Sequence, residues 1–533
     1  MAQLLDIFAF VSVLFRGMTL AFEAMTIGGV IFLRVIARKD LSGATALRLS
    51  QFLTVSSMLL AATQIAFVSA NSAILMNSAG LAWAEVRGAG FCIAGACLVA
   101  GAALAGGFVR ARYGKIVCPV GCVLILCGAV MTSHSAARLE HRGVLVGLTV
   151  AHHLASAGWI GAMPYLLWTL REAPGREVAG VITSRFSRMA MISAAVLAGA
   201  GGLMALLYVG SPGALTGTTY GVMLTAKVTL TALVALLGGL NLRIVRAVRA
   251  GTPASLLPLR RFGEAEVGIG FTVILAAASL TSIPPAVDVT VGRVTISEIA
   301  ARVSPKWPRL RTPALKDLSP PTPLTASQAS AVPSSFVPGQ RTQPNKPSDI
   351  AWSEFNHHWA GLVVLAAGIL AQLAGRISWA RHWPIVFLGL AAFLFLRADA
   401  ENWPLGPRGF WESFQVAEVA QHRLFVVLII AFGVFEWAVR NAHLPAGAAG
   451  LVFPLVCALG GALLLTHSHS LGNLKEEFLA ELSHTPLAVL AVIAGWSRWL
   501  ELRLTPHCGR MLGRVWPVCF ILIGALLLNY REA

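Results

Sequence analysis

Charged residues are scarce in this 533-residue chain: Asp, Glu, Lys and Arg make up only 12% of it, against 56% hydrophobic residues. So little polar surface cannot cover a water-soluble globule of this length, which excludes a soluble protein. The sequence also lacks a GxxxxGKS or GxxxxGKT phosphate-binding loop, an HExxH zinc motif and a nucleophile placed beside a base. We therefore expect no ATP hydrolysis and no enzymatic activity.

What the chain does contain is a series of long apolar runs. A helix needs roughly 20 mostly apolar residues to cross about 30 Å of hydrocarbon. About 14 runs meet this requirement, and a dozen or so crossings remain compatible because the run at 383–397 is short. The sequence thus predicts an all-α, polytopic transmembrane helix bundle. The expected spans are residues 8–33, 52–75, 88–109, 116–133, 144–168, 187–208, 220–243, 264–283, 358–375, 383–397, 421–439, 447–466, 485–500 and 515–530.

Basic residues indicate how these helices are oriented. Lys and Arg gather in alternate loops, among them 34–48, 110–115, 171–188, 243–261 and 498–514. Because short basic loops stay on the cytoplasmic side, both termini are expected outside. The formal charge of +17 then reflects topology in a bacterial plasma (inner) membrane rather than nucleic-acid binding.

Proline is concentrated in residues 284–350, a segment whose composition cannot bury enough apolar area to fold alone. We expect it to be an external linker between an N-terminal eight-helix membrane domain, residues 1–283, and a C-terminal six-helix membrane domain, residues 351–533. An amphipathic stretch at 294–303 is a candidate for docking on the membrane surface.

Most of the 13 histidines fall on the predicted outer side. Histidine occurs at helix ends simply because it is amphipathic, but a helix N-terminus also keeps imidazole neutral, which is the metal-binding form. Imidazole nitrogen suits copper as Cu(I) or Cu(II). The candidate ligands at the outer ends of helices entering the membrane are His152, His153, His357, His358, His422 and His484.

The densest group of histidines lies in THSHSLGNLKEEFLAELSHTP. His467 and His469 flank a serine, and alternate residues of an extended chain point the same way. His484 opens the next apolar run. We predict that these three residues form the central part of an outer metal site.

Ionisable groups within the apolar runs indicate a polar path. Each costs about 2.5–3.5 kcal/mol at the centre of a membrane helix. Glu23 lies in the middle of the first run and is the stronger candidate, with Gln64 and Asn71 on the second run beside it. Lys227, in the outer third of the seventh run, either pairs with Glu23, lines the same path or extends toward the interface.

Two other groups have simpler interpretations. None of the eight cysteines forms a CxxC pair, and most lie in apolar runs, where a thiol packs as a small apolar group. Cys118 and Cys122, one turn apart near an inner end, are the exception that would pass Cu(I) toward the cytosol. Arg423, Glu436 and Glu501, near helix ends, are expected to be interfacial anchors.

One segment resembles a known family. Residues 185–285 contain, in order, RFSR, GSPGAL, TTYGVMLTAK, LN and LTSIPP, a succession that resembles the copper resistance D (CopD) domain. The preceding AHHLASAGWIGAMPYLLW is similar to that family's histidine-bearing helix, with His152 or His153 as its histidine. The C-terminal helices are similar to those of long members.

The resemblance implies a role in copper resistance or in moving copper across the inner membrane, often beside a small periplasmic copper-binding partner. Such a partner is not fused to this chain, because the linker lacks histidines and methionines. The resemblance leaves the direction of movement and the oligomeric state open. The alternative is a haem-binding electron-transfer protein, since histidines facing each other across helices also ligate haem iron.

Overall fold

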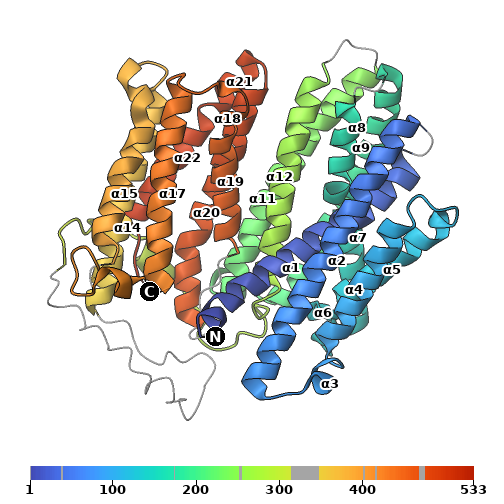
Figure 1. Cartoon of the computed structure of the whole chain (residues 1–533), viewed down its shortest axis with the longest axis horizontal. Helices are drawn as coiled ribbons and strands as arrows, with labels where there is room; N and C mark the ends of the chain where they lie inside the picture. Colours follow the sequence, from blue (N-terminus) through green and yellow to red (C-terminus); the bar gives the residue numbers. More distant parts are fainter. Residues whose placement is uncertain are drawn as a thin grey trace.

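The computed structural model describes residues 2–37, 40–172, 175–250, 255–313, 347–399, 402–414, 417–466 and 474–532 (Figure 1). Within these ranges every regular element is a helix, which confirms the predicted all-α bundle. Thirteen of the described helices are long and apolar enough to cross a membrane. The predicted span at 358–375 falls in α14 (Pro347–Leu373), which is not among the thirteen but packs along α22 and α15.

The N-terminal half contains eight long helical segments. They are α1 (Ala2–Ile31) with the π-helical turn η1 (Phe32–Ile36), α2 (Gly43–Ala79), α4 (Gly90–Gly107), α5 (Gly114–Met131), α7 (Arg142–Ser156) continued by η2 (Ala157–Gly161) and α8 (Met163–Arg171), α9 (Arg176–Val209), α11 (Thr219–Arg249) and α12 (Leu257–Leu280). Short helices at one end are α3 (Trp83–Val86), α6 (His134–Ala137) and α10 (Pro212–Thr216).

The C-terminal half contains six long segments. They are α14, α15 (Val386–Arg397) preceded by the 3-10 helix η5 (Ser378–Ile385), α17 (Ala417–Arg440), α19 (Val452–Leu464), α20 (Leu474–Arg503) and α22 (Val515–Leu528). Its short helices are α16 (Phe410–Ser413), α18 (Ala446–Ala449) and α21 (Pro506–Leu512). In Figure 1 both described chain ends lie at the same lower end of the molecule, which we call the outer end after the predicted topology.

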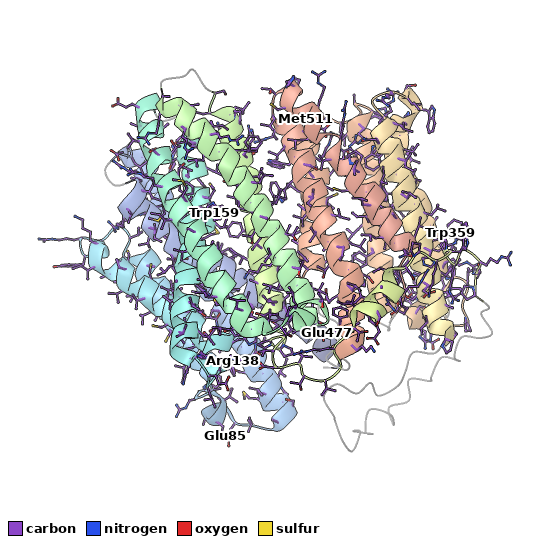
Figure 2. The ribbon with its side chains drawn as sticks, turned by 180° about the vertical axis from the view of Figure 1, so that it is seen from behind. Glu85, Arg138, Trp159, Trp359, Glu477 and Met511 are labelled. Atoms are coloured by element: carbon purple, nitrogen blue, oxygen red, sulfur yellow. The ribbon has the colours of Figure 1, made fainter. Side chains whose placement is uncertain are left out.

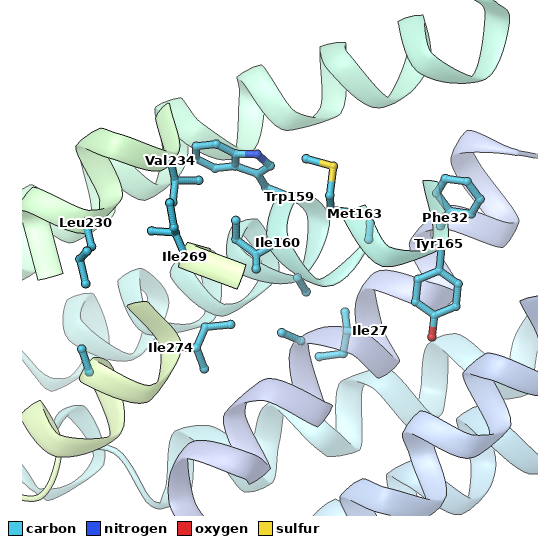
Figure 3. Close-up of a cluster of buried hydrophobic side chains, with 14 of the residues drawn as sticks. Ile27, Phe32, Trp159, Ile160, Met163, Tyr165, Leu230, Val234, Ile269 and Ile274 are labelled. Carbon is cyan, nitrogen blue, oxygen red and sulfur yellow. The ribbon is translucent and has the colours of Figure 1, made fainter. Parts of the chain in front are cut away.

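The centre of the N-terminal half is held by backbone-to-backbone packing of α1 on η2. A Cβ on Gly161 would lie 1.9 Å from the carbonyl oxygen of Ala24, and one on Gly28 would lie 2.4 Å from the carbonyl carbon of Gly161. Small residues let membrane helices approach closely in this way. Figure 3 shows the apolar layer around the contact, with Ile27 of α1 facing Ile160 and Ile274.

Gly161→Ala is therefore expected to destabilise the protein by about 1–3 kcal/mol, because a rigid backbone stands where the methyl group must go. Gly147→Ala, on the same helical segment, is the matched control, since a Cβ there would meet nothing within 4 Å. Thermal unfolding in detergent measures both variants. Equal melting temperatures for the two would contradict the packing argument.

The two halves meet along α20, which packs against α11 and α12 (Figure 1). The Trp496 ring covers Gly268 so closely that a Cβ there would lie 1.5 Å from the indole Cζ2. Glu264 of α12 accepts a hydrogen bond from Trp499 Nε1 at 3.0 Å and pairs with Arg503 at 3.3 Å. Figure 2 shows Glu477, near the start of α20, at the outer end between the halves.

The described part of the proline-rich connection, residues 284–313, packs on both halves. Its helix α13 (Ile296–Val303) begins with a capping box formed by Thr295 and Glu298. Glu298 pairs with Lys475 of α20, and this ammonium together with the Thr295 bonds lowers the pKa of Glu298 to about 2. Arg302 Nη1 donates to the carbonyl of Glu532 at 2.7 Å. The expected amphipathic piece thus docks on the protein, and residues 314–346 lie outside the described ranges.

Two of the predicted interfacial anchors are instead buried. Glu436 is 2% exposed and accepts a hydrogen bond from Arg440 Nε at 2.6 Å, while Arg440 lies 4.8 Å above the Trp383 ring and 5.1 Å from Trp516. Arg423 is buried as well. The anchor prediction was wrong for both residues because the rings that cover the Glu436–Arg440 pair, and the carbonyls to which Arg423 donates, come from other helices and loops.

Candidate functional site

A contact between a histidine and a glutamate lies in the middle of the N-terminal half. His153 of α7 and Glu23 of α1 meet with 2.7 Å between Nδ1 and Oε1, and Glu23 is only 2% exposed. An ionised carboxylate can only accept, so in that state Nδ1 carries the proton and a neutral ring presents its lone pair on Nε2. A metal-binding histidine typically donates its other N–H to a carboxylate in this way.

The placement of this contact corrects the predicted position of the histidines. α7 begins at Arg142, so His153 lies eleven residues into the helix, about 16 Å from its start at 1.5 Å per residue. His357 and His484 likewise lie ten residues after the first residues of α14 and α20. α14 and α20 begin well before their predicted apolar runs, and His153 lies inside the run 144–168, so none of the three histidines stands at a helix mouth.

The predicted path residues separate into two groups around Glu23. Gln64 of α2 is buried and accepts a hydrogen bond from Thr19 of α1 at 3.2 Å, one turn from Glu23. Asn71 instead donates to the carbonyl of Phe67 in its own helix at 2.8 Å. Gln64 therefore belongs to the polar layer, whereas the Asn71 amide is used within α2.

His152 and Lys227 form the other side of this layer. The His152 ring faces α9, where a Cβ on Gly201 would lie 3.4 Å from its Cε1. Its Nδ1 is buried without a hydrogen-bond partner in the described structure. Lys227 of α11 is close enough to interact electrostatically with His152. Glu23 thus pairs with His153, not with Lys227.

Arg16 closes the layer on its outer side. Its Nε donates to Thr281 Oγ1 at 2.6 Å and its Nη2 to the carbonyl of Thr132 at 2.5 Å, which joins α1 to the ends of α12 and α5. Burial lowers the pKa of the nearby His134 and keeps that ring neutral. A guanidinium therefore stands between Glu23 and the outer surface.

A second histidine pair lies near the outer end of the C-terminal half. The rings of His357 and His484 have centroids 6.4 Å apart, and Tyr530 stacks on His357 at 3.8 Å. Each Nδ1 contacts the carbonyl four residues earlier, Ser353 at 2.9 Å and Ala480 at 2.8 Å. A carbonyl only accepts, so Nδ1 of each ring carries a proton, and the neutral form of either histidine has its lone pair on Nε2.

Tyr530 and Glu532 complete this corner. Burial raises the pKa of the Tyr530 phenol, which stays protonated and donates to Glu532 Oε2 at 2.9 Å. Ser353 donates to the same carboxylate oxygen. The pair is therefore bordered by an aromatic ring and a carboxylate, both from the C-terminal segment.

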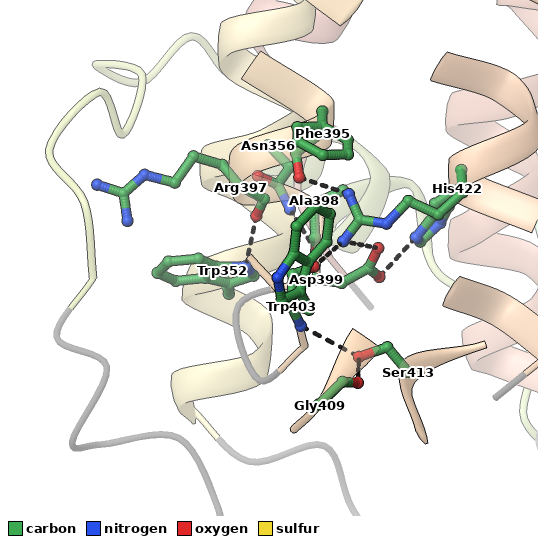
Figure 4. A network of polar contacts seen from close by, with 11 residues as sticks. Trp352, Asn356, Phe395, Arg397, Ala398, Asp399, Trp403, Gly409, Ser413 and His422 are labelled. Carbon is green, nitrogen blue, oxygen red and sulfur yellow. Dashed lines mark hydrogen bonds and ion pairs between the residues drawn. The ribbon is translucent and has the colours of Figure 1, made fainter. Parts of the chain in front are cut away.

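Two of the predicted ligands are used structurally. His358 is fully buried, accepts from the Arg309 N–H at Nδ1 at 2.7 Å and lies 3.0 Å from the Tyr530 carbonyl through Nε2. His422 Nδ1 lies 2.7 Å from Asp399, whose other oxygen is 3.9 Å from Arg423 (Figure 4). Both His358 nitrogens are engaged, and the Arg423 guanidinium disfavours a further cation beside His422.

The predicted loop ligands His467 and His469 lie outside the described residues, so the three-histidine site with His484 stays a prediction. In the part of the chain that is described, no group of three or more His, Cys, Asp or Glu side chains is arranged to hold a metal ion. Cys118 and Cys122 are buried, and the Cys118 thiol contacts the carbonyl of Ala105 at 3.4 Å, as a packing residue does.

Sequence reasoning missed one buried polar pair, Glu266 of α12 and Asn241 of α11. Asn241 Nδ2 donates to Glu266 Oε2 at 3.1 Å. Glu266 lies near the predicted beginning of the eighth span at residue 264, but α12 begins at Leu257 and places it nine residues inside the helix. The signal for the earlier start is Pro258, a residue typical of the first turn of a helix.

One known family matches part of this chain. Residues 180–280, which include most of α9 and all of α10, α11 and α12, match the family model for copper resistance protein D. The chain carries a CopD domain. This confirms the resemblance seen at 185–285 and, together with the helix bundle, supports a copper-resistance membrane protein. No curated protein and no solved structure matches the chain.

The CopD domain forms one wall of the polar layer, although Glu23 and His153 lie outside the matched residues. Gly201 of α9 and Lys227 of α11 belong to it; Gly201 lies against the His152 ring, and Lys227 is close enough to interact with it electrostatically. The layer is thus assembled from the domain together with α1, α2 and α7. A family match over α9–α12 alone covers only part of this layer.

Proposed function

We propose that this protein binds copper ions at its outer face and moves them into the membrane through the Glu23–His153 layer, in a bacterial plasma membrane. The observation that carries the proposal is the 2.7 Å contact between His153 and Glu23, which lies in the middle of the candidate membrane span Phe10–Ile36. Ionisable groups at such depth are costly and mark ion pathways. The match to the copper resistance protein D family is the reason for proposing copper as this ion.

His357 and His484 are the proposed outer ligands. Two imidazoles with lone pairs on Nε2 suit copper, and the Glu532 carboxylate beside them favours a cation. A small periplasmic copper-binding protein is the expected donor to this corner. Haem is the alternative ligand, but Tyr530 packs 3.8 Å from His357 and 6.0 Å from His484, so a porphyrin would have to separate three contacting rings.

The double variant His357→Ala/His484→Ala is expected to lose one equivalent of bound copper, because the outer ligands are removed together. Copper per purified protein is measured under reducing conditions, alongside an absorption spectrum. His141→Asn is the control: His141 is exposed and has φ 53°, a conformation that Asn tolerates. His467→Ala/His469→Ala/His484→Ala extends the test to the predicted loop ligands.

Unchanged copper in the His357→Ala/His484→Ala variant would overturn the outer site. A Soret band in the wild type without stoichiometric copper would replace the copper proposal by the haem alternative.

A further inference from the structure

A cavity of about 210 Å³ lies between the helices of the CopD domain and the preceding segment η2–α8, and it has no role in the proposed copper path. Its walls come from η2 and α8, α9, α11 and α12, and its lining includes Trp159, Met163, Phe186, Leu242, Asn241 and Glu266. Figure 3 shows Trp159 and Met163 side by side on this wall. Leu170, Val245 and Leu259 also line it, next to the predicted inner ends of their helices.

One end of the cavity is polar and incompletely satisfied. Glu266 is 1% exposed, and its Oε1 has no hydrogen-bond partner in the described structure; the same holds for Asn241 Oδ1. The only contact between the two residues joins Asn241 Nδ2 to Glu266 Oε2. Two buried acceptor oxygens without donors are costly, and they call for a ligand that donates hydrogen bonds.

The other end opens toward the bilayer. Met191 of α9 and Ala235 and Gly239 of α11 line the cavity and are also exposed on the outside of the bundle. Because both helices are membrane spans, lipid covers this surface. A ligand can therefore enter sideways between α9 and α11, without passing through water.

Size and wall chemistry decide between an ion and an organic molecule. A bare metal ion would leave most of 210 Å³ empty, whereas an apolar cavity of about 150 Å³ already admits a benzene ring. The walls are mainly apolar side chains, as in small-molecule sites, with one polar end that fixes orientation. A molecule with an aromatic ring and a hydroxyl group matches the apolar walls with its ring and the polar end with its hydroxyl.

We propose that this cavity binds a lipid-soluble hydroxyaromatic molecule, of the phenol or hydroquinone class. Its hydroxyl donates to Glu266 Oε1 or Asn241 Oδ1, its ring packs against Trp159, and its alkyl tail leaves between α9 and α11. The proposal is independent of copper binding, because none of these residues belongs to the Glu23–His153 layer or the His357–His484 pair.

The test uses 2-decylhydroquinone as the probe and titration calorimetry of the full-length protein in detergent. The wild type is expected to bind one equivalent saturably, and decylbenzene, which lacks the donor, at least about tenfold more weakly. Glu266→Gln is expected to weaken binding of the hydroquinone by a similar factor.

Two glycines of the membrane helices supply a pair of variants. Gly238→Ala places a Cβ 2.8 Å from Glu266 Oε1 and 3.5 Å from Trp159 Cζ2, so it fills the polar end and should abolish binding. Gly202→Ala, on α9 away from the cavity lining, adds a Cβ with nothing within 4 Å and should bind as the wild type does. Thermal unfolding without ligand checks that both are folded.

Absence of saturable binding to the wild type, or equal weakening by the two alanines, would overturn the proposal. So would Glu266→Gln losing a bound copper while the hydroquinone fails to bind the wild type, a result that would assign a cation to this cavity instead.

Discussion

Replacing Glu23 by glutamine is expected to lower copper transport by about 10- to 100-fold, the usual cost of losing a carboxylate that supports a metal-binding histidine. The 2.7 Å contact fixes the His153 ring with its lone pair on Nε2, and an uncharged amide holds the imidazole less firmly. The measurement is the initial rate of radioactive copper uptake by proteoliposomes containing the purified protein. His153→Ala, which removes the ligand itself, should reduce the rate at least as much.

Stability separates this functional role from a structural one. Glutamine removes an ionisable group that costs about 2.5–3.5 kcal/mol at the centre of a membrane helix, so the melting temperature should stay constant or rise. Glu140→Gln, on an exposed outer loop, is the control and should transport at the wild-type rate. A folded Glu23→Gln protein with wild-type transport would refute the role of Glu23, and a lowered melting temperature would assign it to packing.

Glu436→Leu is expected to produce the largest loss of stability in the C-terminal half, about 3–5 kcal/mol. Removing this carboxylate leaves the Arg440 guanidinium buried without its 2.6 Å partner. Arg498 lies over the same Trp516 ring, 5.6 Å from its centroid, so two positive charges would remain with the one carboxylate of Glu501. Thermal or denaturant unfolding in detergent measures the loss.

The double variant Glu436→Leu/Arg440→Met provides the discriminating comparison. Replacing both members of a buried ion pair by apolar residues is often nearly neutral. The double variant should therefore be more stable than Glu436→Leu alone. If it is equally unstable or worse, packing of the Arg440 stem against Trp383, rather than the unpaired charge, dominates this site.

Hydropathy predicted the approximate position of the membrane helices, and about 14 of them against the thirteen candidates among the described residues, because crossing hydrocarbon constrains length and composition directly. It did not predict where the helices begin. α20 starts at Leu474, eleven residues before the predicted span, because the polar stretch LKEEFLAELS is also helical and its Lys475 pairs with Glu298 of α13. Capping and tertiary packing set such boundaries, and neither is encoded in mean hydropathy.

The candidate site was likewise predictable only in part from the sequence. Glu23 was predictable because a carboxylate in an apolar run is costly wherever it lies. Its partner was not, since the sequence contains no spacing that connects residue 23 to residue 153. Tertiary structure also brings His357 beside His484. It places both nitrogens of His358 in contact with the backbone of Arg309 and Tyr530, which the sequence does not indicate. The sequence predicts where a residue lies along its own helix, but it does not predict which residue of another helix it contacts.

The contact of α20 with α12 also has an evolutionary consequence. Gly268 is covered by Trp496, Glu264 binds Trp499 and Arg503, and Ser279 donates to the Leu465 carbonyl at 2.7 Å. In a protein that ended after the CopD domain, Gly268, the Glu264 carboxylate and the Ser279 hydroxyl would face lipid directly. We expect ancestors or relatives without the second half to bear larger, apolar residues at these three positions, so that fusing the halves required remodelling of this one helix face.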